Sequence, residues 1–241
     1  MNDAALAGRL AREAGRLLID LRVKAGLEGK ALGDAGDAAA HAFLVDELRR
    51  NRPADGLLSE EGSADPARLA QRRVWIVDPL DGTREYSEGR DDWAVHVALV
   101  QDGCARTGAV ALPALDLVWD TGQAVTVPPG PDPLTIVISR SRPPAEAARA
   151  AERLGAALLP MGSAGAKAMA VVRGVAHAYI HAGGQYEWDS AAPAAVAAAA
   201  GLHVSRLDGS PLLYNRPDPY LPDLIICRPE LAAPLLKAVR D

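Results

Sequence analysis

The chain has 241 residues, of which 49% are hydrophobic, and its formal net charge is −5. This length predicts one large domain or two tightly joined halves, and the charge argues against a nucleic-acid binder, which would present a basic face. The two cysteines, Cys104 and Cys227, predict neither a disulfide framework nor a zinc site. Because the N-terminus lacks a signal-peptide profile and no apolar run reaches ~20 residues, we expect a soluble cytoplasmic protein without membrane contact.

The first half of the chain predicts helices followed by a mainly antiparallel sheet. Asp3 can cap a helix that runs to about residue 23, and a second helix is expected from about Asp37 to Arg50. Strands are expected over residues 57–59, 73–77, 93–100, 104–111, 115–119 and 124–127.

Residues 128–133, Pro-Pro-Gly-Pro-Asp-Pro, are the one clear linker. Beyond them strands and helices alternate, with strands expected over 134–138, 157–160, 175–181 and 224–227 and helices over 145–154, 163–173, 190–200 and 229–239. We therefore expect an α+β half at residues 1–127 and an α/β half at residues 134–241, with the site at their junction.

The most informative motif is Asp-Pro-Leu-Asp-Gly-Thr at residues 78–83. It follows the apolar run 74–77, so both carboxylates are expected where a buried strand leaves the core. Two carboxylates and a free carbonyl at such a turn favour a site for a hard divalent cation, with room for water and phosphate. An isolated Asp-x-x-Asp would favour a surface turn instead, but the full hexapeptide after a buried strand is more specific.

Two other segments match the same pattern in the same order: Ser59-Glu60-Glu61-Gly62 and Glu187-Trp188-Asp189-Ser190-Ala191-Ala192-Pro193. With residues 78–83, they resemble the signatures of the lithium-sensitive, magnesium-dependent sugar phosphatases. That superfamily includes inositol monophosphatases, fructose-1,6-bisphosphatases and 3′-phosphoadenosine-5′-phosphate phosphatases. The resemblance covers most of the chain and implies a layered α-β-α-β-α sandwich, whereas periodicity alone predicts only mixed α and β.

The resemblance implies a pair of magnesium ions, with manganese as a substitute and lithium as an inhibitor. By this resemblance Glu60, Asp78 and the Leu80 carbonyl hold the first ion, and Asp78, Asp81 and Asp189 hold the second. Asp78 would bridge the two ions. Such a pair neutralises phosphate oxygens, lowers the pKa of a bound water and stabilises the leaving alkoxide.

The resemblance also implies three catalytic residues, Thr83, Asp37 and Glu60. Asp37 would polarise the Thr83 hydroxyl beside the attacking water. The alternative for Asp37 is a plain helix N-cap. Asp34 stands where the family has a threonine, and it is a candidate ligand for a weak third ion.

Several segments resemble the CysQ-type branch of the family, which acts on 3′-phosphoadenosine 5′-phosphate: Arg84-Glu85-Tyr86, Ser139-Arg140-Ser141, Gly162-Ser163 with Lys167, and residues 209–216. The implied substrate-binding residues are Gly82, Thr83, Ser139, Arg140, Gly162, Ser163, Lys167 and Asp189. The remote 5′-phosphate requires fixed cationic donors, for which Arg140, Lys167 and Arg216 are candidates. Arg142 stands where that branch carries a histidine. For each cation the alternative is an exposed surface charge.

The sequence therefore predicts a phosphoric monoester hydrolase, a 3′(2′),5′-bisphosphate nucleotidase with a small phosphorylated substrate; the resemblance implies a homodimer and a role in sulfate assimilation. Inositol-1-monophosphatase or fructose-1,6-bisphosphatase activity is the alternative, because the metal core is shared. Two other classes stay open: an inactive nucleotide-sensing protein, and a structural domain stabilised by metal.

Overall fold

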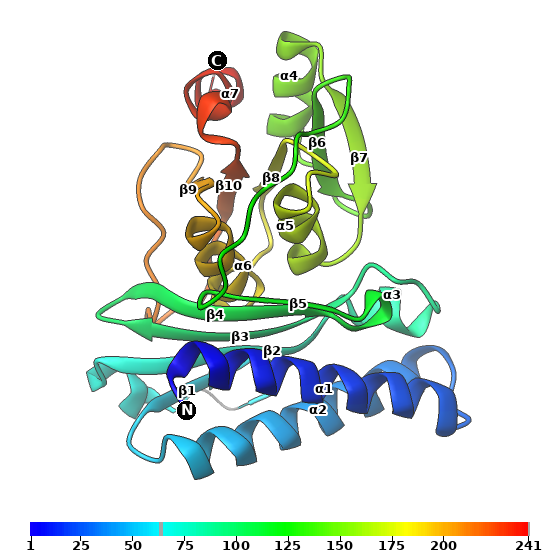
Figure 1. The fold of residues 1–241 in the computed structure, drawn as a ribbon, viewed down its shortest axis with the longest axis vertical. Helices are drawn as coiled ribbons and strands as arrows, with labels where there is room; N and C mark the ends of the chain where they lie inside the picture. Colours follow the sequence, from blue (N-terminus) through cyan, green and yellow to red (C-terminus); the bar gives the residue numbers. More distant parts are fainter. Residues whose placement is uncertain (63–64, 241) are drawn as a thin grey trace.

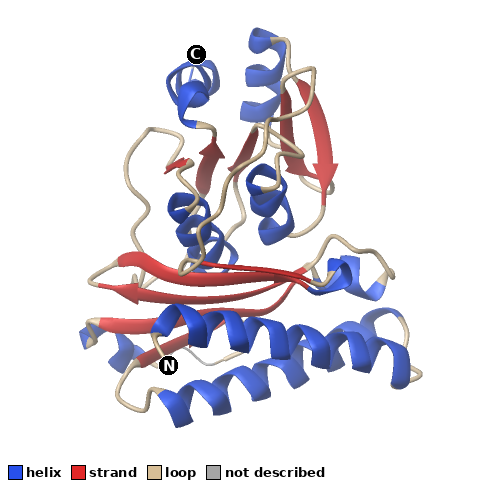
Figure 2. Ribbon diagram, viewed as in Figure 1, coloured by secondary structure: helices blue, strands red, loops and turns tan. Residues whose placement is uncertain are grey.

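Five layers, alternately helical and β, stack along the molecule in the computed structural model, which describes residues 1–62 and 65–240 (Figure 1). The two long N-terminal helices cover the outer face of the first sheet, two helices fill the space between the sheets, and two more cover the outer face of the second sheet (Figure 2). In that order the helices are α1 (Asp3–Lys24), α2 (Gly29–Asn51), α5 (Ala164–Val172), α6 (Glu187–Ala199), α4 (Ala145–Leu154) and α7 (Ala232–Arg240). The predicted α-β-α-β-α layering is confirmed.

The first sheet holds five strands in chain order, with the first pair parallel and the others antiparallel. They are β1 (Gly56–Ser59), β2 (Arg73–Asp81), β3 (Ala94–Gln101), β4 (Cys104–Leu112) and β5 (Leu117–Asp120). Helices cover both of its faces, so its central strands read as continuous apolar runs rather than as an alternation. Trp75 and Val77 pack toward α1 and α2, whereas Val74 and Ile76 belong to the core between the sheets.

The second sheet has the order β7-β6-β8-β10-β9 and mixes parallel and antiparallel pairs. Its strands are β6 (Thr135–Ser139), β7 (Ala157–Met161), β8 (Ala178–Ala182), β9 (His203–Ser205) and β10 (Asp223–Cys227). The chain enters it through residues 128–133, which carry no helix or strand. The short strand β9 and the one-turn helix α3 (Thr83–Ser87) were not predicted.

The expected start of the second helix was wrong, because α2 begins at Gly29 and not near Asp37. The added turns contain Gly33 and Gly36, and glycine lowers helix propensity. Tertiary packing explains both: a Cβ at Gly33 would lie 2.7 Å from the Thr83 side chain, and one at Gly36 would lie 3.0 Å from Leu80. The glycines therefore let α2 press directly against the loop that carries the Asp-Pro-Leu-Asp-Gly-Thr motif.

The strand expected over residues 124–127 was also wrong, since this segment has no regular structure. Val125 and Val127 are partly buried against the core between the sheets. Their alternation therefore reflects packing without ladder pairing, and Pro128 and Pro129 follow at once.

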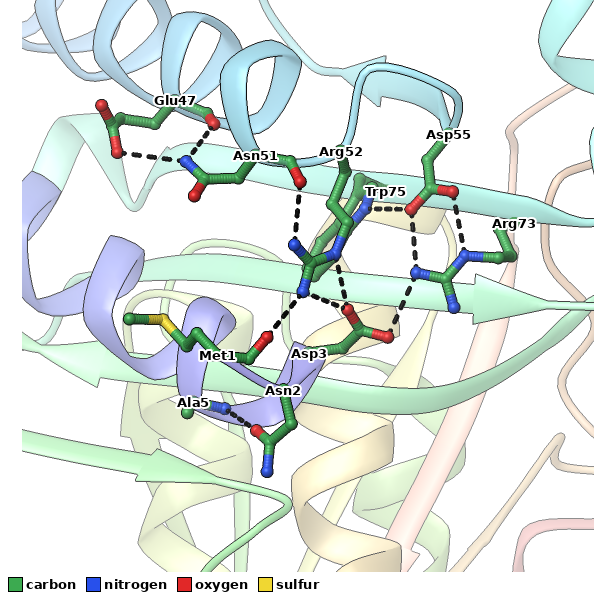
Figure 3. A network of polar contacts seen from close by, with 10 residues as sticks. All are labelled: Met1, Asn2, Asp3, Ala5, Glu47, Asn51, Arg52, Asp55, Arg73 and Trp75. Atoms are coloured by element: carbon green, nitrogen blue, oxygen red, sulfur yellow. Dashed lines mark hydrogen bonds and ion pairs between the residues drawn. The ribbon is translucent and has the colours of Figure 1, made fainter.

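A charge network ties the start of α1 to the start of β2 (Figure 3). We call Asp3, Arg52, Asp55, Arg73 and Trp75 the N-terminal charge network. The Arg73 guanidinium bonds both Asp55 oxygens at 2.9 Å and reaches Asp3 at 3.1 Å, the Trp75 indole donates to Asp55 at 2.9 Å, and Arg52 bonds Asp3 at 2.8 Å.

The cap of α1 is Asn2, whose side chain accepts from the Ala5 amide at 2.8 Å, so the prediction of Asp3 as the cap was wrong by one residue. Asp3 joins the charge network instead.

Over residues 1–62 and 65–240, none of the helices combines the length and apolar character that crossing a membrane requires.

Candidate metal centre

Three aspartates from distant segments converge at the carboxyl end of β2. Asp78 and Asp81 lie on β2 itself, and Asp189 lies in the first turn of α6. One carboxylate oxygen from each lies within 4.8 Å of the others. The β2–β3 ladder shifts register between Asp78 and Asp81, where Pro79 lacks the N–H that a regular ladder needs. This irregularity lets two carboxylates three residues apart reach the same point.

The cluster concentrates negative charge in a place with little water. Burial raises the pKa of Asp78 well above its ordinary value, and the charge of Glu60 adds to the effect. Burial, followed by the charge of Asp81, raises the pKa of Asp189 to about 7. Asp189 is held in position by the Tyr186 amide, which donates to it at 2.6 Å. Like charges at this spacing favour protonation unless a cation joins them.

Asp81 is the member of the cluster that polar neighbours already hold. Its Oδ2 accepts from the Ser163 hydroxyl at 2.5 Å and from the Gly165 amide at 2.7 Å, and it lies 3.2 Å from His96 Nε2. Burial alone would raise the pKa of Asp81, but the charge of His96 and these hydrogen bonds hold it below its ordinary value. With Oδ2 engaged three times, Oδ1 is the oxygen left for a ligand.

His96 lies beside Asp81, and this carboxylate favours the charged form of the imidazole. Its Nδ1 lies 3.0 Å from the Trp188 carbonyl, which can only accept, so Nδ1 carries a proton. In a neutral ring Nε2 would then carry no proton, and its lone pair would face the negatively charged carboxylate of Asp81, which is unfavourable. Burial opposes the charge, but Asp81 outweighs it and raises the pKa of His96. His96 is thus a buried partner of a carboxylate.

Glu60 lies at the open side of the cluster, directly after β1, and its amide donates to the Val77 carbonyl at 3.3 Å. Its carboxylate is within hydrogen-bonding reach of Asp78. Loss of water raises the pKa of Glu60 to about 7, and the charge of Asp189 adds to the effect, although the residue keeps an exposed face. Glu60 is not one of the three residues whose oxygens converge within 4.8 Å among those described, and its role as a ligand stays a prediction.

Thr83 lies between the Leu80 carbonyl and Asp37. Its hydroxyl is 3.2 Å from the Leu80 oxygen and 3.4 Å from Asp37 Oδ1. Both distances are long for a hydroxyl donor, which has a single proton to give. Asp37 is buried, and burial, followed by the charge of Glu61, raises its pKa to about 7.

Asp37 lies inside α2, so the alternative that it is a helix cap is wrong. Asp34 lies one turn earlier on the same helix, is exposed, and pairs with Lys30 at 2.6 Å. Its role toward a third ion stays a prediction.

A cavity of about 500 Å³ opens beside the aspartates. It is lined by most of the predicted substrate-binding residues, namely Gly82, Thr83, Ser139, Gly162, Ser163, Lys167 and Asp189. Within the described part of the chain, Arg140 and Arg216 are not among its lining residues. Arg84, Arg142, Tyr179 and His181 line it and were not predicted as site residues.

Lys167 is buried beneath the cavity wall. Its ammonium donates to the Ser163 carbonyl at 2.5 Å and to the Gly162 carbonyl at 3.1 Å, and it lies 5.3 Å from the centre of the Tyr179 ring. Burial lowers its pKa to about 8. Lys167 therefore supports the Gly162–Ser163 turn and brings positive charge to the cavity.

The donors present suit a hard divalent cation. Carboxylate oxygens dominate, the Leu80 carbonyl lies 3.2 Å from the hydroxyl of the lining residue Thr83, and no thiol lines the cavity among the residues described. Oxygen donors of this kind match Mg²⁺ or Mn²⁺ rather than a soft metal. The raised pKa values of Asp78 and Asp189 fit the same interpretation, because a bound cation would stabilise both carboxylates in their charged form.

Known proteins resemble this chain along its whole length. The model of the inositol monophosphatase family matches residues 3–127 and 134–241. The 3′-phosphoadenosine 5′-phosphate phosphatase of Mycobacterium leprae (strain TN) is 52% identical over 256 aligned positions, which cover 100% of this chain and 94% of that protein. The 3′(2′),5′-bisphosphate nucleotidase CysQ of Escherichia coli (strain K12) is 34% identical, over 78% of this chain and 81% of its own length.

Solved structures agree with the sequence comparisons. CysQ from Bacteroides thetaiotaomicron, described as a bacterial member of the inositol monophosphatase family, superposes with a TM-score of 0.84 at 26% identity and covers 94% of this chain and 97% of its own. Inositol monophosphatase II from Staphylococcus aureus shares the fold, with a TM-score of 0.81 at 21% identity over 98% of this chain and 94% of its own. This chain therefore belongs to the inositol monophosphatase family.

Proposed function

We propose that this protein is a metal-dependent phosphomonoesterase that removes the 3′-phosphate of 3′-phosphoadenosine 5′-phosphate and releases AMP and phosphate. The observation that carries the proposal is the convergence of Asp78, Asp81 and Asp189 within 4.8 Å at the wall of a cavity of about 500 Å³. The relatives in Mycobacterium leprae and Escherichia coli, which are named for this activity, support the choice of substrate. In this role the enzyme would clear a by-product of sulfate assimilation.

The proposed cofactor is Mg²⁺, bound at two positions. Glu60, Asp78 and the Leu80 carbonyl would hold one ion, and Asp78, Asp81 and Asp189 would hold the other. When bound, these ions supply charge neutralisation at the phosphate and a water of lowered pKa. Mn²⁺ is the proposed substitute, and Li⁺ the proposed inhibitor.

The chain itself supplies the proton acceptor and the orientation of the ester. Asp37 has a pKa of about 7, which suits a group that accepts a proton near neutral pH. Thr83 lies between Asp37 and the Leu80 carbonyl, so its hydroxyl would pass the proton of the attacking water toward Asp37, with Glu60 on the open side. Gly82, in the left-handed region at φ 93°, turns the chain so that the amides of Gly82 and Thr83 would face the phosphate.

Substrate competition tests the proposal. Phosphate release is measured with Mg²⁺ from 3′-phosphoadenosine 5′-phosphate, inositol 1-phosphate and fructose 1,6-bisphosphate, and kcat/KM is compared. We expect the nucleotide to be preferred and turnover to stop with excess chelator. A hundredfold preference for inositol 1-phosphate would overturn the assignment of the substrate.

The other two classes make different predictions in the same assay. A nucleotide-sensing protein would bind the nucleotide and release no phosphate. A metal-stabilised structural domain would unfold on chelation and show no turnover with Mg²⁺.

Thr83→Ser and Thr83→Val separate the effect of the hydroxyl from that of the side-chain shape. The serine variant should retain turnover, and the valine variant should lose kcat more than it changes KM.

A further inference from the structure

Of the three cations that the resemblance implied for the remote phosphate, Lys167 is the one among the described residues that lines the cavity. Arg140 Nη2 bonds Glu85 at 2.6 Å and Glu88 at 3.0 Å. Two carboxylates thus neutralise Arg140, and Arg140 is absent from the described lining of the cavity. Arg216 lies on a different surface hollow. A phosphate that replaced those carboxylates at Arg140 would leave Glu85, which is buried, without its partner.

Arg142, two residues further along the loop after β6, has the opposite properties. It lines the cavity and is exposed. Throughout residues 1–62 and 65–240, no carboxylate comes within ion-pair distance of its guanidinium, whereas Arg140 has two. Its positive charge acts on the cavity wall, because it contributes to lowering the pKa of His181 and opposes the rise in the pKa of Tyr179.

Two loops hold Arg142 in place. Its amide donates to the Ser139 hydroxyl at 3.2 Å, which fixes the turn after β6. On the other side the guanidinium lies against Gly184 in the loop after β8. A Cβ on Gly184 would lie 2.5 Å from Arg142 Nη1, and its φ of 67° also favours glycine. The Ser139 turn therefore fixes the backbone of Arg142, and its guanidinium rests against Gly184 at the cavity wall.

Among the described residues, Arg84 and Arg142 are the arginines of the lining that have no carboxylate within ion-pair distance; Arg84 directly follows Thr83, whereas Arg142 lies on the loop after β6. Burial lowers the pKa of His181 to about 4, so the imidazole is neutral at physiological pH. Lys167 is committed to the Gly162 and Ser163 carbonyls. Glu85 also lines the cavity, but its carboxylate is paired with Arg140.

We propose that Arg142 binds the 5′-phosphate of the substrate and thereby sets the preference of the enzyme for nucleoside bisphosphates over monophosphates. This inference rests on the proposed function. A guanidinium offers two parallel donors to a phosphate and stays charged at any physiological pH. Arg140 then has a supporting role: it neutralises Glu85 and Glu88, so that the wall near Arg142 does not repel the incoming anion.

The test compares two substrates that differ only in the remote phosphate. kcat/KM is measured for adenosine 3′,5′-bisphosphate and for adenosine 3′-monophosphate with the wild type, Arg142→Gln and Arg142→Lys. Loss of a charge-assisted, two-donor contact should lower the preference for the bisphosphate about 10- to 100-fold in Arg142→Gln. Arg142→Lys keeps the positive charge but loses the two parallel donors of the guanidinium, so it should retain part of the preference for the bisphosphate.

Two matched variants remove the same charge elsewhere. Arg106→Gln removes an exposed arginine on β4 that is not among the described lining residues, and it should leave the preference as in the wild type. Arg84→Gln removes the other exposed arginine of the lining. If Arg84→Gln abolishes the preference and Arg142→Gln retains it, the assignment to Arg142 is wrong.

A binding measurement separates failure of this inference from failure of the proposed function. AMP carries only the remote phosphate, so its dissociation constant reports on Arg142 without turnover. Weaker AMP binding by Arg142→Gln, with adenosine binding as in the wild type, supports the inference even if the bisphosphate is not hydrolysed. Equal AMP affinity in the two proteins, together with an unchanged preference in turnover, overturns the inference and leaves the proposed function standing.

Discussion

The two ends of strand β2 carry acidic side chains in opposite electrostatic states. At its beginning, the N-terminal charge network pairs Asp3 and Asp55 with arginines (Figure 3). At its end, Asp78 and Asp81 meet Asp189 with no arginine or lysine in ion-pair contact among the residues described. Burial alone would raise the pKa of Asp3, but Arg52 and Arg73 lower it, whereas burial and like charge raise the pKa of Asp78.

This difference shows at which end of β2 the polypeptide itself supplies the charges that neutralise the carboxylates. The charge network has its countercharges within the chain, so folding satisfies it. In the acidic cluster only Asp81 lies beside a basic group, His96, among the residues described. Asp78 and Asp189 keep raised pKa values, so a bound cation would supply the positive charge that they lack. The carboxylates alone do not distinguish the N-terminal charge network from the acidic cluster. The presence or absence of basic partners around the carboxylates indicates which group is a metal site.

The largest expected effect comes from neutralising the cluster. Asp78→Asn removes the carboxylate proposed to bridge two ions, and kcat should fall about 10³-fold, on the scale of losing metal-type electrostatic stabilisation. The asparagine can still accept from the Leu80 amide, which donates to Asp78 at 3.1 Å. In chelator the variant should be as stable as the wild type or more so, because one repelling charge is gone.

Steady-state assays and thermal melts in EDTA measure both halves of this prediction. Asp102→Asn serves as the matched control, because Asp102 pairs with Arg72 on the surface with a side chain that is 60% exposed. It should change neither kcat nor stability measurably. Near-normal turnover of Asp78→Asn would exclude the bridging role.

The second effect is a pH dependence of opposite sign at the two ends of β2. Without metal, the pKa values of Glu60 and Asp189 are about 7, above their ordinary values of 4.5 and 3.8. The folded protein then binds more protons than the unfolded chain between pH ~4 and ~7. Stability should fall as pH rises through this window, about 10-fold in the folding constant per pH unit for each group that titrates.

Asp3 contributes the other way, because its pKa is lowered. Its stabilisation is present above its ordinary pKa of 3.8 and is lost as pH falls through the lower folded value. Urea unfolding at pH 3, 4, 5, 6, 7 and 8 in EDTA, repeated with Mg²⁺ from pH 5 upward, distinguishes the two contributions. Mg²⁺ should flatten the slope between pH 5 and 7; a metal-free protein that becomes more stable over that range would contradict the interpretation of the cluster.

The sequence predicted the fold class and the motif that carries the cluster, because both depend on local signals. The run 73–77 before the Asp-Pro-Leu-Asp-Gly-Thr motif indicated a buried strand, and β2 is that strand. The first turns of α2 were missed, since Gly33 and Gly36 are unfavourable in an isolated helix. Their function is contact with Thr83 and Leu80, which only the folded chain reveals.

The sequence also could not predict which arginine pairs with which carboxylate. Arg140 and Arg142 are two residues apart in one loop and look equivalent in the sequence. Glu85 and Glu88, which come from α3 and the residue that follows it, pair with Arg140 alone. Which arginine pairs with carboxylates depends on long-range contacts between the two halves of the chain, and motif matching cannot show these contacts.

A smaller effect is expected at the beginning of β2. Asp55→Asn would remove the charge that Arg73 contacts twice, and it would leave one acceptor oxygen where two now serve Arg73 and the buried Trp75 indole. The free energy of unfolding should fall by about 2 kcal/mol, the scale for leaving hydrogen-bonded groups unsatisfied, and kcat should stay as in the wild type. Chemical denaturation and phosphate release measure the two; a drop in kcat without loss of stability would link this network to catalysis.

The smallest effect is expected from loosening Asp81 without removing it. Ser163→Ala deletes the hydroxyl that donates to Asp81 Oδ2 and accepts from the Ala166 amide at 2.9 Å. The Gly165 amide and His96 still hold Asp81, so the Mg²⁺ concentration for half-maximal activity should rise about 10-fold, at the low end for groups that orient metal ligands. Direct titration with Mn²⁺ by electron paramagnetic resonance measures the same affinity without turnover. If Ser163 bound substrate only, as the motif resemblance implied, KM for the nucleotide would rise and the metal affinity would not change; a shift in metal affinity alone assigns Ser163 to the support of Asp81.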